Sequence, residues 1–295
     1  MLKFKSPALS DYSKFAQFFF DEGEFSCEMN FISIYIWKAI YENKFYMDDK
    51  TLFFKSASED GGYVFSLPYG DIDYGMSLIF DYCKENGIKP NIWTSQGKRL
   101  DTFLKKYTNY EVVPERDNFD YIYKREDLVS LAGKKYHSKR NHISAFSKKY
   151  NWTYEPLDES NKEEFLSFSE KWYFDKADAF DEGLAAEQKA LKEILNSNVG
   201  IDYKGALIRV DGRVVAVTMG SPINSKVFDI HFEKADTEYS GAYALINREF
   251  ALRELGDYEY INREDDLGLE GLRKAKLSYK PAILLEKYSI LYKGE

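Results

Sequence analysis

The chain has 295 residues and a net charge of −8, and this length suits two domains of roughly 100–200 residues each. A hydrophobic fraction of 44% and an aromatic fraction of 17% exclude a disordered protein. The negative charge argues against a general nucleic-acid coat and against sequence-specific DNA binding. No apolar run reaches the roughly 20 residues of a membrane span, and no signal-peptide core is visible. We therefore expect a soluble, cytoplasmic protein without an integral membrane segment.

Cysteine and histidine usage predicts neither a disulfide framework nor a metal site. The two cysteines, Cys27 and Cys83, lie far apart and form no CxxC pattern, which fits a reducing compartment. The three histidines, His137, His142 and His231, show no HxxxH or HExxH spacing. His231 falls on an expected strand, and we interpret it as a packed, hydrogen-bonded core residue.

In the first half, helical and alternating patterns follow each other in a regular order. The expected elements are helices at 9–20 and 29–41, strands at 44–48, 51–56 and 63–67, a helix at 74–85, a strand at 91–95, a helix at 98–107, and strands at 110–114 and 119–124. Turn residues separate the strands, for example Asp60-Gly61-Gly62.

The second half repeats much of this order. The expected elements are a helix at 134–150, a strand at 152–157, helices at 162–174 and 184–195, strands at 206–210, 213–221 and 226–233, a helix at 241–255, a strand at 258–263, a helix from about 268, and a strand at 282–292. Asp211-Gly212 is typical of a tight hairpin turn.

The repeated order predicts an α+β protein of two tandem GNAT-like (acyl-CoA N-acyltransferase) domains. Each domain is expected to hold a mixed, mostly antiparallel sheet flanked by helices. We place the boundary between residues 133 and 134, which gives domains 1–133 and 134–295. The first domain shows no recognisable cofactor loop, so we expect the substrate site in the second.

Residues 134–150 form a basic segment in an acidic protein, with six cations and no acid. Lys139 shares a helical face with Tyr136, Ile143 and Phe146. One interpretation is a solvated helix whose Lys139 side chain reaches water. The other is an anion site in which residues of this helix, Lys139 and Arg140 first among them, bind phosphate.

The junction around Gly241 has the position of the GNAT pyrophosphate cradle, where exposed backbone N–H groups and a helix N-terminus bind coenzyme A. Aligned on Gly241, this chain has Glu238 where the motif needs Gln or Arg, and Tyr243 where it needs a small residue. The coenzyme cradle therefore looks damaged. The alternative is an ordinary glycine at a strand-to-helix turn.

Residues 258–276 offer acid, base and cation candidates together. Strict alternation places Asn262 and Glu264 on one strand face, and Glu264 would be a general base at the strand end. Asp266 is expected to cap the next helix. Arg273 and Lys276 occupy apolar-stripe positions of that helix, either to bind a substrate anion or to pair with upstream acids such as Glu264.

Three segments together resemble a bacterial family. They are GKKYHSKRNHI at 133–143, FEKAD…GAYALIN at 232–247, and YINREDDLGLEGLRKAKLSYKP at 260–281. The family is largely uncharacterised and similar to the C-terminal catalytic domain of phosphatidylglycerol lysyltransferases, and more distantly to Fem-type peptidyltransferases. The resemblance implies tandem GNAT-like domains that move an aminoacyl group from charged tRNA without coenzyme A. It also implies a substrate site at Arg273 and Lys276.

We therefore expect an acyltransferase that moves an aminoacyl or acyl group to an amine or hydroxyl acceptor. The alternatives are an acetyl-CoA-dependent N-acetyltransferase, or a non-catalytic module that binds an anionic small molecule. Aminoacyl-tRNA is the expected donor and acetyl-CoA the less favoured one, and no metal is expected. The catalytic candidates are Glu264, Arg273 and Lys276. The substrate-binding candidates are Lys139, Arg140, Asn141, His142, Glu233, Lys234, Gly241, Tyr243, Asn262 and Asp266.

Overall fold

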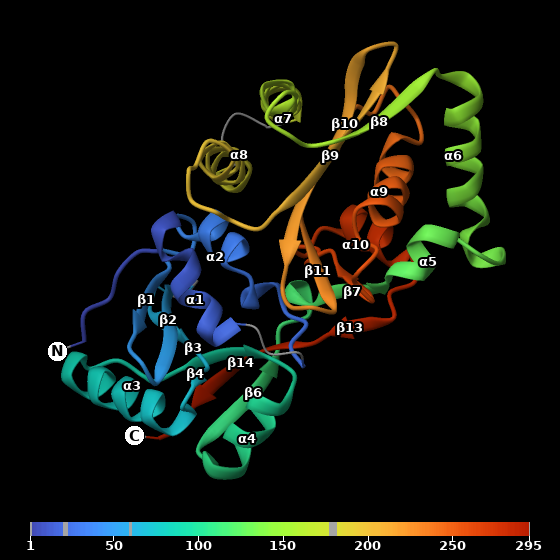
Figure 1. The fold of residues 1–295 in the computed structure, drawn as a ribbon. Helices are drawn as coiled ribbons and strands as arrows, with labels where there is room; N and C mark the ends of the chain where they lie inside the picture. The colour runs from blue at the N-terminus through green and yellow to red at the C-terminus, as the bar shows by residue number, and fades with distance from the viewer. Residues whose placement is uncertain (1, 20–22, 59–60, 177–181, 295) are drawn as a thin grey trace.

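The computed structural model describes residues 2–19, 23–58, 61–176 and 182–294, and it shows two mixed sheets flanked by helices (Figure 1). Sheet A has seven strands, in the order β1-β2-β3-β5-β14-β6 with β4 beside β2. These strands are β1 (Lys44–Met47), β2 (Thr51–Ala57), β3 (Tyr63–Ser66), β4 (Tyr69–Gly70), β5 (Ile92–Ser95), β6 (Tyr110–Pro114) and β14 (Lys287–Tyr292).

Sheet B also has seven strands, in the order β13-β7-β12-β11-β10-β9-β8. These strands are β7 (Asp120–Lys124), β8 (Trp152–Pro156), β9 (Lys204–Val210), β10 (Arg213–Pro222), β11 (Val227–Ala235), β12 (Tyr260–Asn262) and β13 (Ile283–Leu285). Each sheet has one parallel pair, β3 with β5 and β11 with β12, and its other paired strands are antiparallel. The expected α+β class with mostly antiparallel sheets is confirmed.

The two sheets exchange one strand each. β7, from the first half of the chain, pairs with β12 and β13 in sheet B. β14, from the C-terminus, lies between β5 and β6 in sheet A. One strand was expected at 282–292, but the structure divides this segment into β13 and β14, which lie in different sheets. The domain boundary between 133 and 134 stays a prediction, and the chain crosses between the sheets on both sides of it.

Helices cover the faces of both sheets (Figure 1). They are α1 (Tyr12–Phe19), α2 (Phe31–Trp37), α3 (Ile72–Asn86), α4 (Lys98–Lys106), α5 (Arg125–Ser130), α6 (His137–Lys149), α7 (Lys162–Lys176), α8 (Glu182–Leu195), α9 (Ala242–Arg253) and α10 (Glu270–Leu277). Short 3-10 turns lie at Leu9–Asp11, Cys27–Met29, Arg116–Asn118 and Lys134–Tyr136. The sequence missed α5, and residue 20 of the predicted first helix lies outside the described residues.

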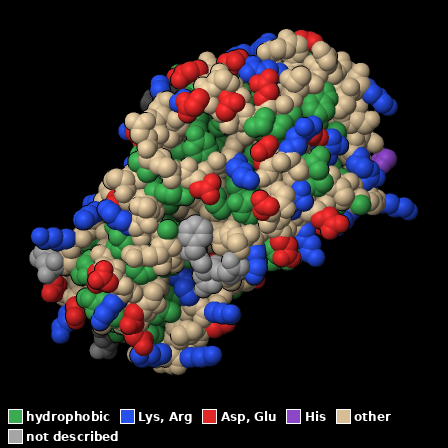
Figure 2. Space-filling model, viewed as in Figure 1, with side chains coloured by type: hydrophobic (Ala, Val, Ile, Leu, Met, Phe, Trp, Pro, Cys, Tyr) green, Lys and Arg blue, Asp and Glu red, His purple; other side chains and the backbone are tan. Residues whose placement is uncertain are grey.

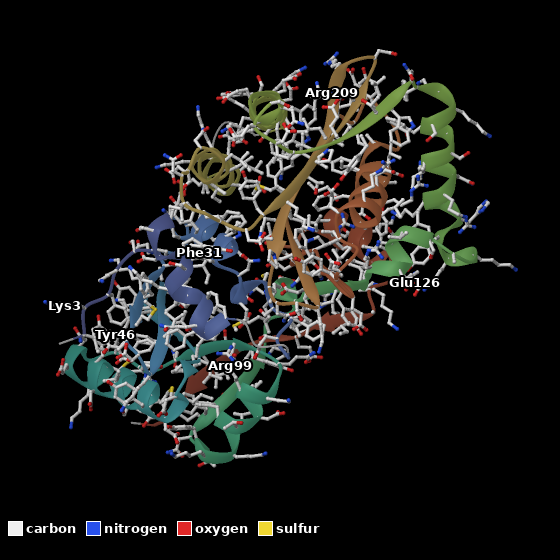
Figure 3. All side chains as sticks on the ribbon, in the orientation of Figure 1. Lys3, Phe31, Tyr46, Arg99, Glu126 and Arg209 are labelled. Carbon is white, nitrogen blue, oxygen red and sulfur yellow. The ribbon has the colours of Figure 1, made fainter. Side chains whose placement is uncertain are left out.

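A shared hydrophobic core joins the two halves. Phe15 and Phe31 from the first half are buried in one cluster with Ile194 and Val227 from the second. Figure 3 shows Phe31 on α2, where the N-terminal helices approach α8. Burying such a side chain is worth about 1.5–3 kcal/mol, so this cluster fixes the position of one sheet against the other.

The surface visible in Figure 2 carries acidic and basic side chains interspersed. Among the described residues, no helix combines the length and the apolar character that crossing a bilayer requires.

Candidate functional site at the junction of the two sheets

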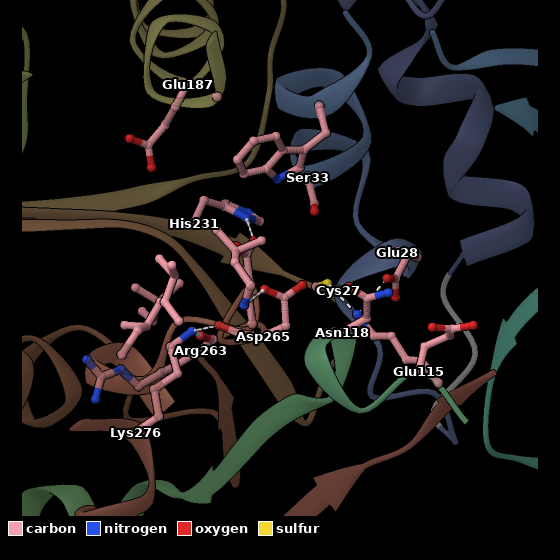
Figure 4. A pocket seen from close by; sticks show the side chains of 18 of the residues that line it. Cys27, Glu28, Ser33, Glu115, Asn118, Glu187, His231, Arg263, Asp265 and Lys276 are labelled. Carbon is pink, nitrogen blue, oxygen red and sulfur yellow. Dashed lines mark hydrogen bonds and ion pairs between the residues drawn. The ribbon is translucent and has the colours of Figure 1, made fainter. Parts of the chain in front are cut away.

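A cavity of about 1380 Å³ lies where the two halves meet. Its lining combines residues from sheet A, from the turn at Cys27–Met29, from β11 and α9, and from the segment that joins β12 to α10. In Figure 4, Cys27 and Glu28 approach from the first half, while Arg263, Asp265 and Lys276 lie on the opposite side. The volume exceeds the roughly 300–1,000 Å³ of a typical small-molecule pocket.

Glu264 and His231 form a hydrogen-bonded pair on the cavity wall. His231 Nδ1 lies 3.1 Å from Glu264 Oε1, and His231 Nε2 lies 2.7 Å from the Ser221 hydroxyl. The His231 side chain is fully buried, whereas that of Glu264 keeps 17% of its surface exposed. The expected core histidine is thus buried and hydrogen-bonded, and it also holds the carboxylate that faces the cavity.

The backbone of Glu264 adopts a left-handed conformation that a non-glycine residue rarely takes, with φ at 54°. Two hydrogen bonds hold it there. The Glu264 N–H donates to Asn262 Oδ1 at 2.7 Å, and the Tyr121 N–H donates to the Glu264 carbonyl at 3.1 Å. Such backbone strain, fixed by its surroundings, is a feature that clusters at functional sites.

Asn262 itself is buried and does not line the cavity, as far as the described lining extends. Its side-chain amide donates to Asp120 Oδ2 at 2.9 Å and to the Phe25 carbonyl at 2.8 Å. Asn262 therefore connects the Glu264 backbone to the first half of the chain.

A compensated charge cluster lies beside this pair. Lys287 Nζ contacts Asp120 Oδ1 at 2.7 Å and Glu28 Oε1 at 2.5 Å, and lies 3.3 Å from Cys27 Sγ. Burial alone would lower the pKa of Lys287, but Asp120, Cys27 and Glu28 outweigh it and raise that pKa. Burial also raises the pKa of the Cys27 thiol well above its usual value, so Cys27 is protonated at neutral pH.

Lys276 reaches the cavity and supports the segment that carries Glu264. Its Nζ donates to the carbonyl of Arg263 at 2.6 Å and to that of Asp265. Burial lowers the pKa of Lys276, and Asp265 and Glu264 oppose that shift. Burial likewise raises the pKa of Asp265 to about 7, although Lys287 opposes the shift.

Arg273 lies outside the described cavity lining and makes ion pairs instead. Its guanidinium contacts Asp266 at 2.7 Å and Asp117 at 2.6 Å, not the expected Glu264. Asp266 also accepts from the Tyr121 hydroxyl at 2.5 Å. Burial would raise the pKa of Asp266, but the hydrogen bonds from Arg273 and Tyr121 prevail and lower it to about 2.

Two local expectations about this segment are wrong. Asp266 does not cap α10, because the N-cap of this helix is Leu269. The Asp266 carboxylate instead accepts a hydrogen bond from the N–H of Gly268, two residues later. No residue of α10 is buried, and Leu269 is 58% exposed. The helix is short and lies at the surface, so Arg273 and Lys276 do not replace core leucines.

On α6, the predicted face is confirmed, because Tyr136, Ile143 and Phe146 are all buried. Lys139 lines the cavity, with Nζ 3.9 Å from the centre of the Tyr279 ring. Burial, followed by the charge of Arg263, lowers the pKa of Lys139.

The other candidates on α6 lie differently. Arg140 donates to the carbonyls of Leu131 and Gly133, the latter at 2.8 Å. Asn141 is exposed and bonds to His137, whereas His142 lines the cavity. Arg140 therefore secures the start of the basic helix.

Helix α6 packs against the start of α9. A Cβ added at Gly241, where φ is 100°, would lie 2.6 Å from the carbonyl oxygen of His142. Gly241 is thus required by helix packing. Tyr243 lines the cavity next to it, and burial raises its pKa.

Glu233 and Lys234 lie at the end of β11 and both line the cavity. Glu233 pairs with Arg263 at 2.7 Å, and Lys234 pairs with Glu187 at 3.0 Å. Of the cation candidates in the cavity, Lys234 is therefore balanced by a nearby acid.

The comparisons with known proteins identify the family. The family described as "Phosphatidylglycerol lysyltransferase, C-terminal" matches residues 22–291 of this chain. The chain belongs to this family. An uncharacterised protein of Mycoplasmoides gallisepticum is 26% identical over 201 residues, which is 66% of this chain. The chain spans 62% of that relative's length.

Solved structures of similar proteins agree in fold. A conserved protein of unknown function from Bacteroides thetaiotaomicron is 35% identical, with a TM-score of 0.88 over 99% of this chain and 100% of that one. L-PGS from Bacillus licheniformis is 16% identical, with a TM-score of 0.65 over 99% and 94%. FemX is 8% identical, with a TM-score of 0.61 over 99% and 98%. Family and fold are acyltransferase-like, and the tandem GNAT-like architecture is confirmed.

The cavity brings together most of the candidates, whose roles stay predictions. The candidates that line it are Lys139, His142, Glu233, Lys234, Gly241, Tyr243, Glu264 and Lys276. The candidates absent from its described lining are Arg140, Asn141, Asn262, Asp266 and Arg273.

Sequence reasoning missed Asp120, Asp229 and Lys287 altogether. Asp229 and His231 alternate on one face of β11, inside the apolar run VFDIHF. Two polar residues on one face of an otherwise apolar strand indicate a buried polar site, and this pattern was visible in the sequence. Lys287 offered no such signal, because its partners come from segments more than 150 residues away.

Proposed function

We propose that the protein transfers an aminoacyl group from an aminoacyl-tRNA to an amine or hydroxyl acceptor. The observation that carries this proposal is the placement of Glu264, a carboxylate held by His231 on the wall of a large cavity. A carboxylate within reach of a bound acceptor can remove its proton as the acceptor attacks. The fold and the family support acyl transfer in general, and the aminoacyl donor is the proposed refinement.

In the proposed reaction, Glu264 takes the proton of the acceptor amine or hydroxyl. The acceptor then attacks the ester carbonyl of the donor, and the bond to the ribose oxygen breaks as the tRNA leaves. Lys276 uses two of its three N–H donors on backbone carbonyls. The third is proposed to stabilise the developing oxyanion, a role usually worth several kcal/mol.

Arg273 is proposed to act as a positioning residue. It holds Asp266, and Asp266 fixes the turn between Glu264 and α10. Lys139 and the basic face of α6 are proposed to bind the phosphates of the donor. In this proposal Arg140 secures that helix.

The residue at the start of α9 supports a donor other than coenzyme A. Tyr243 lines the cavity at the position where the coenzyme A motif needs a small residue. The cavity volume supports two substrates bound together, since it is larger than one small ligand needs. A cytoplasmic location belongs to the same proposal, because charged tRNA is found there.

The test is a transfer assay with labelled aminoacyl-tRNAs and two acceptors, phosphatidylglycerol vesicles and soluble amines. We expect label to move to an acceptor, and Glu264→Gln to abolish the transfer. Glu85→Gln, an exposed residue of α3, is the matched control and keeps full activity. Calorimetry with coenzyme A is the counter-test.

Tight coenzyme A binding would instead establish an N-acetyltransferase. If Glu264→Gln still binds an anionic ligand and the wild type transfers nothing, the chain is a binding module. Either result overturns the proposal.

A further inference from the structure

Asp229, His231 and Glu264 form a compact cluster whose ligand atoms all lie within 4.8 Å of one another. His231 Nδ1 lies 3.1 Å from Glu264 Oε1 and 3.5 Å from Asp229 Oδ2. Two ligands bound at about 2.1 Å to one cation lie roughly 3.0 Å apart at right angles and roughly 3.4 Å apart in a tetrahedron. His231 Nδ1 therefore lies at the spacing of a shared cation's ligands from both carboxylates.

Asp229 supplies a second, independent observation. Its side chain is 0% exposed, and neither carboxylate oxygen has a hydrogen-bond partner among the residues that the structure describes. A buried carboxylate without a partner is strongly unfavourable. The nearby Asp120 differs, because it is also buried but is paired with Lys287 and Asn262. Both oxygens of Asp229 are therefore available to bind a cation.

The far side of His231 fits a metal ligand as well. Its Nε2 lies 2.7 Å from the Ser221 hydroxyl, which lies 3.0 Å from Asn30 Oδ1. Without a cation, Nδ1–H of His231 donates to Glu264. With a cation bound, the Ser221 hydroxyl would donate to Asn30 and accept the Nε2–H of His231, so that the Nδ1 lone pair would face the ion in place of that hydrogen bond. Metal-bound histidines commonly donate their other N–H to an oxygen in this way.

The charge balance of the surroundings also favours a cation. Three further acids lie in the same region, because Glu28 and Asp265 line the cavity and Asp120 pairs with Lys287 beside it. The two lysines of the region, Lys276 and Lys287, are already engaged by carbonyls and by the Asp120 group. A divalent cation would neutralise the excess of negative charge.

We propose that Asp229, His231 and Glu264 bind one divalent transition-metal ion, such as Zn²⁺ or Mn²⁺. One imidazole nitrogen and two carboxylate oxygens suit these ions. His231 and Glu264 line the cavity, so the remaining coordination positions open toward it. One oxygen of the Glu264 carboxylate would bind the ion, and the other would stay available to take the acceptor's proton. This inference goes beyond the proposed function, since the site would hold Glu264 in place whatever group is transferred.

The spacing of histidines in the sequence gives no indication of this site. It uses a single histidine, a carboxylate two positions earlier on the same strand, and a second carboxylate from the segment after β12. The expectation of no metal came from HxxxH and HExxH patterns, which describe sites built on one helix.

The test is calorimetric titration of the full-length protein, after treatment with a chelator, with Zn²⁺ and with Mn²⁺ separately. We expect one ion per chain, with binding weakened by a factor on the order of 100 in Asp229→Asn and in Glu264→Gln. Cys27→Ser is the matched control, because it alters the neighbouring Cys27, Glu28 and Asp120 cluster. It should change the affinity by less than about twofold.

Three results would overturn the proposal: no binding of either ion, unchanged affinity in both carboxylate variants, or loss of binding in Cys27→Ser. Circular dichroism shows whether Asp229→Asn folds, and the partly exposed Glu264 provides the second variant if it does not. Direct binding needs no donor or acceptor. A protein that binds the ion but transfers nothing therefore contradicts only the proposed function.

Discussion

The two sheets contribute very different walls to one cavity. Strands β2 and β5 of sheet A line it with Ser56, Trp93 and Thr94, which are uncharged. Strand β11 of sheet B and the segment after β12 line it with His231, Glu233 and Glu264. The two sheets therefore differ in function, because His231, Glu233 and Glu264, which can exchange protons, lie on or beside sheet B.

The largest expected difference between the walls is catalytic. Glu264→Gln keeps the shape of the side chain but removes its basicity, so the transfer rate should fall by about 10²–10⁴. Thr94→Val on the opposite wall should change the rate by less than about threefold. Initial rates of aminoacyl transfer are measured for both variants. An equal loss of rate in the two would contradict the proposal that catalysis depends on the sheet B wall.

The next prediction concerns Lys287, the cation that β14 of sheet A inserts among the acids. Lys287→Met leaves Asp120 and Glu28 without their partner, and should lower the free energy of unfolding by about 3–5 kcal/mol. Lys293→Met, which removes an exposed pair with Glu111, should cost about 0–1 kcal/mol. Urea unfolding distinguishes them, and a loss below about 1 kcal/mol at Lys287 would contradict its structural role.

Two glycines compare the start of α9, where α6 packs against the backbone, with the start of α10, where no atom lies close. Gly241→Ala places a Cβ against the His142 carbonyl in left-handed backbone, and should destabilise the protein by about 2–4 kcal/mol. Gly271→Ala meets nothing within 4 Å inside a helix, and should stabilise by about 0.5–1 kcal/mol. Thermal unfolding provides the measurement. If Gly241→Ala left the stability unchanged, the close packing of α6 against this end of α9 would be contradicted.

The smallest expected effect depends on pH and concerns Asp266. Its folded pKa of about 2 lies below the ordinary 3.8, so the ionised form contributes about 2 kcal/mol to stability. That contribution is complete above about pH 4 and disappears as the pH falls from about 4 to about 2. Asp266→Asn should therefore be less stable than the wild type at pH 7, and the gap should close toward pH 2. A gap that stays constant with pH would exclude the Arg273 ion pair as its source.

The elements themselves follow from local sequence. The turn at Asp211-Gly212 and the apolar face of α6 are both confirmed, because each depends on neighbours within a few residues. The motif around Gly241 predicts a damaged coenzyme cradle, which stays a prediction, and the sequence could not name α6 as the helix that packs against this glycine.

Residue choice and spacing thus determined the element order, the acyltransferase-like fold and the importance of the segment that carries Glu264. Only the tertiary structure decided that β7 and β14 exchange sheets, that Arg273 pairs with Asp266, and that Asp229 and His231 meet Glu264. The physical reason is that the exchanged strands pair with residues more than 100 positions away. Even the Arg273–Asp266 pair, whose residues are 7 positions apart, depends on which groups the fold brings together. The energies of these pairings depend on desolvation and geometry that no local pattern contains.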